Sequence, residues 1–333
     1  MRLLLIRTSA MGDIVHCLPA LRVLREELPQ ARIAWVVEDL FAPLLWNDPD
    51  IDELFPVRLQ KWRQTPASPA TWRDARQAQA AIDDYNADVV LDMMGNHKAG
   101  VLAALSGSDR RIGLRRHDRR EPSSAMWLSD SVPAQGGHAV ERALSLLAGI
   151  GLPTDFRGFG AEQLALAGEG GGFESGDRIV IHPGAAWPNK CYPADRWGQV
   201  AATLAEHGEV VLSVGPGEEA LGAEIEAASG GRAHTAEARG LASLVDLMRG
   251  ARLVLGGDTG PTHLAHALDA PTLFLHGPTD PATHGPYAAM ERALWVQLPC
   301  SFCHRRFGTK QLCLIDLKPS RVVAKALEIM EIR

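Results

Sequence analysis

The sequence has no long apolar run, no excess of positive charge and few cysteines. No stretch approaches the ~20 apolar residues that cross a bilayer. The 40 acidic residues outnumber the 34 Lys and Arg residues, and the net charge of −6 argues against a general nucleic-acid partner. The N-terminus reads as a short strand rather than a secretory leader. We therefore expect a cytoplasmic protein whose five cysteines are reduced.

Short apolar segments alternate with helical ones along most of the 333 residues. Residues 3–6, 33–37 and 89–92 have the pattern of strands buried on both faces of a parallel sheet. Strands that alternate with helices predict an α/β fold with doubly wound parallel sheets. At about 100–200 residues per domain, the length suggests two domains.

The composition changes around residues 152–176, where we predict the boundary between the domains. The glycine-rich residues 168–172 suit a linker, and the strand pattern restarts at 178–182. We predict an N-terminal domain over 1–165, a second domain over 176–318 and a C-terminal helix over 319–333. Packing of this helix back toward the first domain is one option. Open α/β sheets bind ligands beyond the carboxyl ends of their strands, so two such sheets predict a central cleft.

The loop Thr8-Ser9-Ala10-Met11-Gly12-Asp13 follows the first strand. Asp13 either caps the helix that follows or is a catalytic carboxylate, which a ligand reaches because Gly12 lets the backbone approach closely. The loop lacks Gly-x-Gly-x-x-Gly, the turn that binds the pyrophosphate of NAD. This absence argues against a dehydrogenase.

Residues 256–267 form a second candidate loop, rich in glycine and small polar residues. Asp258 and Thr259 stand where a strand gives way to a helix, and exposed N–H groups at a helix start fit a diphosphate. A plain capped turn is the alternative. His263 and His266 lack a third ligand nearby in the sequence, so packing or phosphate contact is favoured over metal binding.

Two further loops follow strands of the second half. Lys190, in the loop after residues 178–182, can bring a point charge to a leaving phosphate. Glu218 follows the strand at 210–214, where an acidic residue can hydrogen-bond a ribose. The alternative for Glu218 is the solvated start of a helix.

Six arginines lie in three pairs between Arg110 and Arg120 of this acidic chain. Guanidinium groups match the geometry of carboxylate and phosphate, so such a cluster favours an anionic partner. For half of these arginines, a solvated surface is the simpler interpretation. Lys61 and Arg63 extend the basic patch. Trp62, between them, has the amphipathic character of a membrane-interface residue.

The C-terminal region holds Cys300, Cys303, His304 and Cys313, four residues of the types that bind zinc. The second half of this set lacks its own paired spacing. A cluster of reduced thiols is the main alternative to a structural metal site.

Several of these segments together resemble one family, the bacterial lipopolysaccharide heptosyltransferases of glycosyltransferase family 9, which have the GT-B fold. The resemblance rests on six matching segments in order, which are Ser9-Ala10-Met11-Gly12-Asp13, Arg120-Glu121-Pro122, His138-Ala139-Val140-Glu141-Arg142, Lys190, the run from Asp258 to Leu264, and Gly277-Pro278-Thr279-Asp280-Pro281. The first loop and the segment from His138 look most like heptosyltransferase I. The cysteines of the tail look more like heptosyltransferase II.

The resemblance implies two Rossmann-like domains that face a central cleft and transfer a sugar with inversion. The donor would be ADP-L-glycero-β-D-manno-heptose, with no metal or other cofactor. The acceptor would be the Kdo region of lipid A at the inner face of the inner membrane, in lipopolysaccharide inner-core biosynthesis.

The resemblance also assigns the site residues. Asp13 would be the catalytic base. The donor would be bound by Lys190, Glu218, Asp258, Thr259, Gly260, Thr262 and His263. The acceptor would be bound by Ser9, Lys61, Arg63 and Arg120. The alternatives are a different glycan acceptor, a non-catalytic nucleotide-sugar binding protein, and a nucleotide-sugar epimerase or dehydrogenase.

Overall fold

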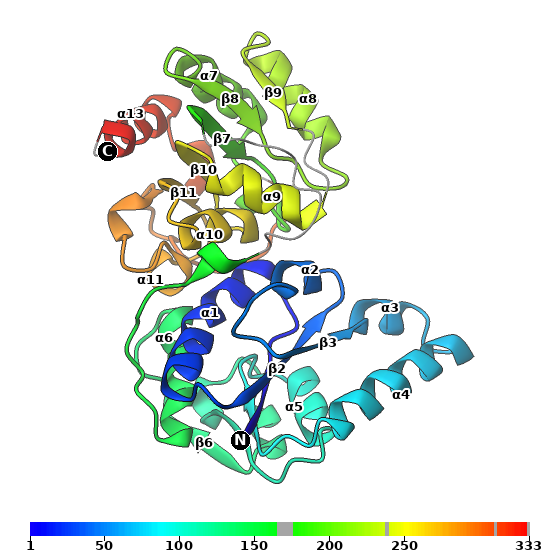
Figure 1. Ribbon diagram of the computed structural model, residues 1–333. Coiled ribbons are helices and arrows are strands. Elements are labelled where there is room, and N and C mark those ends of the chain that lie inside the picture. The colour runs from blue at the N-terminus through cyan, green and yellow to red at the C-terminus, as the bar shows by residue number, and fades with distance from the viewer. Residues whose placement is uncertain (165–175, 237–239, 310–311, 332–333) are drawn as a thin grey trace. The chain divides into compact units, whose positions relative to one another are not determined.

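The computed structural model describes residues 1–164, 176–236, 240–309 and 312–331. The chain divides into two compact units, Met1–Leu166 and Ala167–Arg333 (Figure 1). The linker predicted at 168–172 and the domain end predicted at 165 lie outside the described residues.

The first unit is built on a six-stranded parallel sheet in the order β3-β2-β1-β4-β5-β6. Its strands are β1 (Arg2–Ile6), β2 (Arg32–Glu38), β3 (Glu53–Val57), β4 (Val89–Asp92), β5 (Arg111–Leu114) and β6 (Asp130–Val132). Its helices are α1 (Met11–Glu27), α2 (Ala42–Leu45), α3 (Leu59–Gln64), α4 (Pro69–Asp84), α5 (His97–Ala104) and α6 (Ala139–Leu144). The strand order reverses between β1 and β4, so the loops after these two strands meet where such sheets bind ligands.

The second unit repeats this plan with a parallel sheet in the order β12-β11-β10-β7-β8-β9. Its strands are β7 (Arg178–His182), β8 (Glu209–Leu212), β9 (Ala233–Thr235), β10 (Leu253–Gly257), β11 (Thr272–His276) and β12 (Ala293–Trp295). Its helices are α7 (Ala194–Leu204), α8 (Glu219–Ala228), α9 (Gly240–Arg249), α10 (Gly260–Ala267), α11 (Pro281–His284), α12 (Leu312–Ile315) and α13 (Pro319–Glu331). Two doubly wound parallel sheets are therefore confirmed. Among the described residues, no helix is both long and apolar enough to cross a membrane.

The terminal helix α13 contributes to the core of the second unit. Val322, Ala326, Ile329 and Met330 lie on one face of the helix and pack with the buried residues of β7, β10 and β11. This is the spacing of an amphipathic helix that covers a sheet. Packing of the C-terminal residues toward the first domain stays a prediction.

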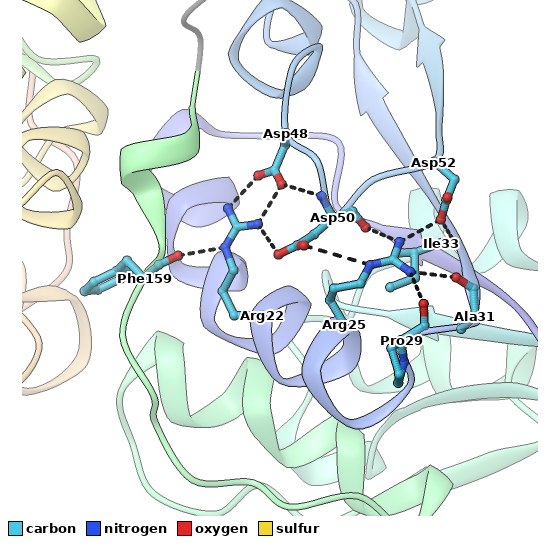
Figure 2. Close-up of polar contacts among 9 residues, drawn as sticks. All are labelled: Arg22, Arg25, Pro29, Ala31, Ile33, Asp48, Asp50, Asp52 and Phe159. Atoms are coloured by element: carbon cyan, nitrogen blue, oxygen red, sulfur yellow. Dashed lines mark hydrogen bonds and ion pairs between the residues drawn. The ribbon is translucent and has the colours of Figure 1, made fainter.

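A network of ion pairs, buried at Asp48 and partly exposed at Asp52, ties α1 to the loop that precedes β3 (Figure 2). Arg22 forms a two-pronged contact with Asp48, at 2.6 and 2.5 Å, and a third contact with Asp50 at 2.6 Å. Its Nε also donates to the carbonyl of Phe159 at 3.2 Å. One turn later Arg25 pairs with Asp52 at 2.7 Å. These contacts fix the helix whose first turn carries Asp13.

Candidate active site

Asp13 lies in the first turn of α1, which begins at Met11. Its Oδ2 is 2.6 Å from Nη2 of Arg7 and accepts the backbone N–H of Ala10 at 3.1 Å. The carboxylate therefore does cap the helix start, as one of the two interpretations expected. It is also one-third exposed, with 32 % of its side-chain surface accessible.

Arg7, the residue that follows β1, orients this carboxylate through the ion pair. Burial of its guanidinium by itself would lower the pKa of Arg7, but the charge of Asp13, the hydrogen bond to Asp13 and the charge of Asp92 together with Cys17 raise that pKa. Nη1 of Arg7 donates to the carbonyl of Met93 at 2.6 Å, in the loop after β4. The pair Arg7–Asp13 thus spans the two loops at the point where the strand order reverses.

A cavity of about 270 Å³ opens beside this loop, within the first unit. It is lined by Thr8, Ser9, Ala10, Glu38, Leu40, Phe41, Leu59, Gln60, Arg63 and Lys98. Two of the predicted acceptor residues, Ser9 and Arg63, therefore meet here. Lys98, from the first turn of α5, adds a second cation that the sequence analysis missed.

Glu38 supplies the acidic side chain in the same lining. Its carboxylate accepts the backbone N–H of Gln60 at 2.9 Å. Burial raises the pKa of Glu38, against the opposing effect of that hydrogen bond. The cavity therefore combines two cations with a carboxyl group that is more easily protonated than a surface glutamate.

Arg120 and Lys61, the other two predicted acceptor residues, are exposed and lie outside this lining. The backbone N–H of Glu121, next to Arg120, donates to the carbonyl of Gly95 at 3.0 Å, so Arg120 is held beside the loop after β4. Lys61 is on α3, two residues before Arg63.

The arginine cluster proves partly structural. Arg119 is buried and pairs with Asp92 at the end of β4, and its Nε donates to Ser124 at 2.8 Å. Arg110 donates to the carbonyl of Gly149 at 2.7 Å, and Arg111 donates to the carbonyl of Trp127 at 2.8 Å. Half of the six arginines therefore serve the fold.

The segment from His138 to Arg142 is structural as well. Ring atom Nδ1 of His138 caps α6 by accepting the backbone N–H of Val140 at 3.2 Å. The backbone N–H of His138 donates to the carboxylate of Glu141 at 2.9 Å. The His138 ring packs edge-on against His16 of α1, with the ring centroids 5.4 Å apart. Arg142 donates to the carbonyl of Asp118. This motif joins α6 to α1.

Asp258 is the centre of the candidate donor site in the second unit. It follows β10 and lies beside two donors, with Lys190 Nζ 2.7 Å from Oδ2 and His263 Nε2 2.9 Å from Oδ1. Burial alone would raise the pKa of Asp258, but the hydrogen bond with His263 and the charge of Lys190 hold that pKa well below its usual range. Lys190 is therefore fixed by a charged partner rather than projecting freely.

The turn that opens α10 places its residues at two depths. Thr259 and Gly260 are half-buried at the helix start, whereas Thr262 and His263 are buried. The hydroxyls of Thr259 and Thr262 are 3.0 Å apart and share a hydrogen bond. His266 instead bonds the carbonyl of Tyr287 at 2.9 Å, which gives it a packing role.

Glu218 lies between β8 and α8, and its side chain is next to the loop that follows β7. Its Oε2 accepts the backbone N–H of Gly215 at 2.8 Å. A Cβ at Gly184 would come within 2.0 Å of its carboxylate, so the glycine leaves room for Glu218. Nearby His182 is buried and its ring shares a hydrogen bond with the carbonyl of Ser213. Burial lowers the pKa of His182, against the opposing charge of Glu218.

The C-terminal loop packs onto the Lys190 loop. The guanidinium of Arg306 lies 4.3 Å from the centroid of the Trp187 ring, and Lys190 lies 5.4 Å from the same centroid. Asn189 donates to the carbonyl of Arg305 at 2.9 Å. Arg306 is a cation near the candidate donor site that sequence reasoning missed, because 116 residues separate it from Lys190.

The cysteines of this region are free. Cys300 and Cys303 are exposed, and Cys313 is buried, which raises its pKa. In the parts of the chain that the structure describes, no three His, Cys, Asp or Glu side chains gather closely enough to hold a metal ion.

Comparisons with known proteins bear on the family and the fold. The family model of glycosyltransferase family 9 (heptosyltransferase) matches residues 76–312. Lipopolysaccharide heptosyltransferase 1 of Pseudomonas aeruginosa is 33% identical, over 99% of this chain and 98% of that protein. The fold is similar to that of E. coli heptosyltransferase WaaC with ADP, at a TM-score of 0.85 and 25% identity over 99% of this chain and 100% of that one. The same enzyme with ADP-2-deoxy-2-fluoro heptose gives a TM-score of 0.81 and 25% identity, over 98% and 99% of the two chains.

Proposed function

The chain belongs to glycosyltransferase family 9, and from this premise we propose that it transfers L-glycero-D-manno-heptose from ADP-heptose to the Kdo region of lipid A. The likeness to heptosyltransferase 1 over nearly the whole chain supports this reaction, as does the likeness to a heptosyltransferase structure with ADP. The observation that carries the proposal is the oriented, partly exposed carboxylate of Asp13 beside a cavity with two cations.

Asp13 is the general base in this proposal. It accepts the proton of the acceptor hydroxyl while that oxygen attacks the anomeric carbon from the face opposite the diphosphate. The new glycosidic bond forms as the bond from the anomeric carbon to the diphosphate breaks, and ADP leaves with the electron pair. The configuration at the anomeric carbon is inverted. Arg7 keeps the carboxylate in place through the 2.6 Å contact.

The second unit binds the donor. Lys190 and the N–H groups at the start of α10, around Thr259 and Gly260, meet the charge that develops on the departing ADP. Thr262 and His263, which are buried, act through Thr259 and Asp258 respectively. Glu218 binds the ribose. Because the protein itself supplies these cationic groups, we propose that transfer needs no metal ion.

The cavity of the first unit binds the acceptor. Arg63 and Lys98 match the carboxylates of Kdo, and Ser9 adds a hydroxyl from the loop that carries Asp13. Lys61 and Arg120 bind further anionic groups at its periphery. The acceptor is lipid-linked, so we propose a cytoplasmic protein that associates with the inner face of the inner membrane.

Release of ADP from ADP-heptose tests the reaction and its acceptor together. We expect release when Kdo-lipid A is added, and none with buffer alone. Release only with an already heptosylated core would contradict the acceptor. A folded protein that releases no ADP with any of these acceptors would contradict the transferase.

A further inference from the structure

The outer face of α4 is an exposed surface that the proposed reaction does not use. Its residues, here called the α4 face, are Pro69, Trp72, Arg73, Arg76, Gln77 and Ala80, and with Ala67 they line an open groove of about 630 Å³. Trp72 is 60 % exposed. Its indole N–H donates to the carbonyl of Pro66 at 2.9 Å, which holds the large ring in this exposed position.

The opposite face of α4 faces the core of the first unit. Ile82 is buried in that core, and Ala78 packs against it. Trp62 of α3 belongs to this inner side as well, because its indole N–H donates to Asp74 at 2.8 Å and its ring packs on the same cluster. Of these two tryptophans, Trp72 is exposed and Trp62 is half-buried. α4 packs on the edge strand β3, so it lies at the periphery of the sheet (Figure 1).

The charge of this region opposes that of the rest of the chain. Residues 58–84, which hold α3 and α4, contain Arg58, Lys61, Arg63, Arg73 and Arg76 and three acidic residues, Asp74, Asp83 and Asp84, which gives a net charge of +2. Since the whole chain carries −6, the remaining residues carry −8. A local positive charge of this size within an acidic protein attracts an anionic surface and leaves the rest of the chain repelled by it.

The two arginines of the α4 face are also available for a partner. Arg58 pairs with Asp39 and Asp74, at 3.0 and 3.1 Å. No carboxylate of the described residues lies within ion-pair distance of Arg73 or Arg76. They differ in this from Arg119, whose charge is neutralised inside the fold by Asp92.

We propose that the α4 face docks on an anionic lipid bilayer, with Trp72 at the interface and Arg73 and Arg76 against the lipid headgroups. Tryptophan is favoured at the boundary between water and lipid, and arginines next to it bind acidic headgroups. Docking there orients the acceptor cavity as well, because Arg63 lines that cavity and α4 begins six residues later. This inference rests on the proposed function for the presence of a lipid-linked acceptor.

Flotation with vesicles tests the surface. The full chain is mixed with vesicles of phosphatidylglycerol and phosphatidylcholine, or of phosphatidylcholine alone. We expect binding to the anionic vesicles only, and a loss of binding as salt is added. Each of Arg73→Gln and Arg76→Gln should weaken binding about fivefold, and Trp72→Ala should weaken it at both low and high salt.

Matched controls come from exposed residues of the same types elsewhere. Trp46 is 62 % exposed but precedes an acidic segment, and Arg232 is an exposed arginine of the second unit. Trp46→Ala and Arg232→Gln should therefore float like the wild type. The proposal is overturned if the wild type does not bind anionic vesicles, or if the α4-face variants bind as well as these controls.

Turnover with a water-soluble, deacylated Kdo acceptor separates this inference from the proposed function. The α4-face variants should retain wild-type turnover with it, because they touch neither the base nor the donor site. Loss of that turnover in folded α4-face variants would overturn a purely docking role. Failure of the wild type with every acceptor would instead contradict the proposed reaction, and flotation would still report on the surface.

Discussion

At the scale of single residues, Gly184 matters for the space that it leaves empty. Any Cβ at this position would lie 2.0 Å from Oε1 of Glu218. The end of a flexible side chain can move, so Gly184→Ala should displace the carboxylate and leave the fold intact. We expect affinity for ADP to fall about tenfold or more, the effect of losing a hydrogen bond to a charged group. Calorimetric titration with ADP measures this change.

The control for this variant is Gly137→Ala, since a Cβ at Gly137 meets nothing within 4 Å. It should bind ADP like the wild type. Unchanged ADP affinity in Gly184→Ala would contradict the ribose contact that we propose for Glu218.

His276 gives the second unit a dependence of stability on pH. It is fully buried at the end of β11, and burial lowers its pKa to about 4, against the opposing charge of Asp258. The ordinary histidine pKa is about 6.5 in the unfolded chain. As the pH falls below about 6.5, the unfolded chain therefore takes up a proton that the folded chain refuses, and stability is lost until the pH reaches about 4.

His276→Leu should remove this part of the pH dependence. Between about pH 7.5 and about pH 5, the wild type should lose about 2 kcal/mol more of its free energy of unfolding than the variant. Denaturant unfolding of both chains at these two pH values measures the difference, because other titrating groups such as His182 are common to both. Parallel losses in the two chains would contradict a neutral, buried His276.

At the scale of elements, ion pairs hold α1 in place in addition to its apolar face. Arg22 is 11 % exposed and the side chain of Asp48 is 0 % exposed. Arg22→Ala would leave that carboxylate buried without its partner, which costs about 3–5 kcal/mol of the free energy of unfolding. Denaturant unfolding followed by circular dichroism measures the loss.

Arg157→Ala is the matched control, because this arginine pairs with the same helix through Glu26 and Glu27 at the surface. Exposed pairs contribute little, so its unfolding midpoint should stay close to that of the wild type. Equal effects of the two substitutions would show that burial is not what makes the Arg22 network stabilising.

The central strands could be predicted from the sequence, whereas the edge strands could not. β1, β4, β7 and β10 are buried on both faces and therefore read as continuous apolar runs. The edge strand β3 contains Pro56, and proline is tolerated only where one side of a strand has no partner. An edge strand such as β3 forms because it pairs with its neighbour β2, and the local sequence of the strand does not show that pairing.

In the candidate site, contacts between residues close in the sequence could be predicted, whereas contacts between residues far apart in the sequence could not. The Asp258 turn could be predicted because its residues are consecutive. The ion pair between Asp258 and Lys190 could not, because 68 residues separate its partners. Arg63 follows β3 and Lys98 follows β4, and the two line one cavity because the sheet order β3-β2-β1-β4 brings the ends of these strands to the same edge. From the sequence, Arg119 is one of a cluster of charges expected at the surface. In the structure its side chain is buried and pairs with Asp92.

At the scale of the whole molecule, the proposed chemistry draws on both units. The first unit supplies the base and the second supplies the charge that meets the leaving ADP. Because that charge comes from Lys190 and from the start of α10, turnover with ADP-heptose should be unchanged when a chelator replaces added magnesium. Steady-state ADP release measured with and without the chelator checks this, and a large loss that magnesium restores would contradict it.

The most direct measurement is the rate of ADP release by the Asp13→Asn variant with saturating ADP-heptose and Kdo acceptor. Asparagine keeps the size of the side chain and cannot take a proton at neutral pH. If Asp13 is the base, release should fall about 10²–10⁴-fold while the affinity for ADP stays at the wild-type value. Near-normal release by a folded Asp13→Asn protein would contradict the account.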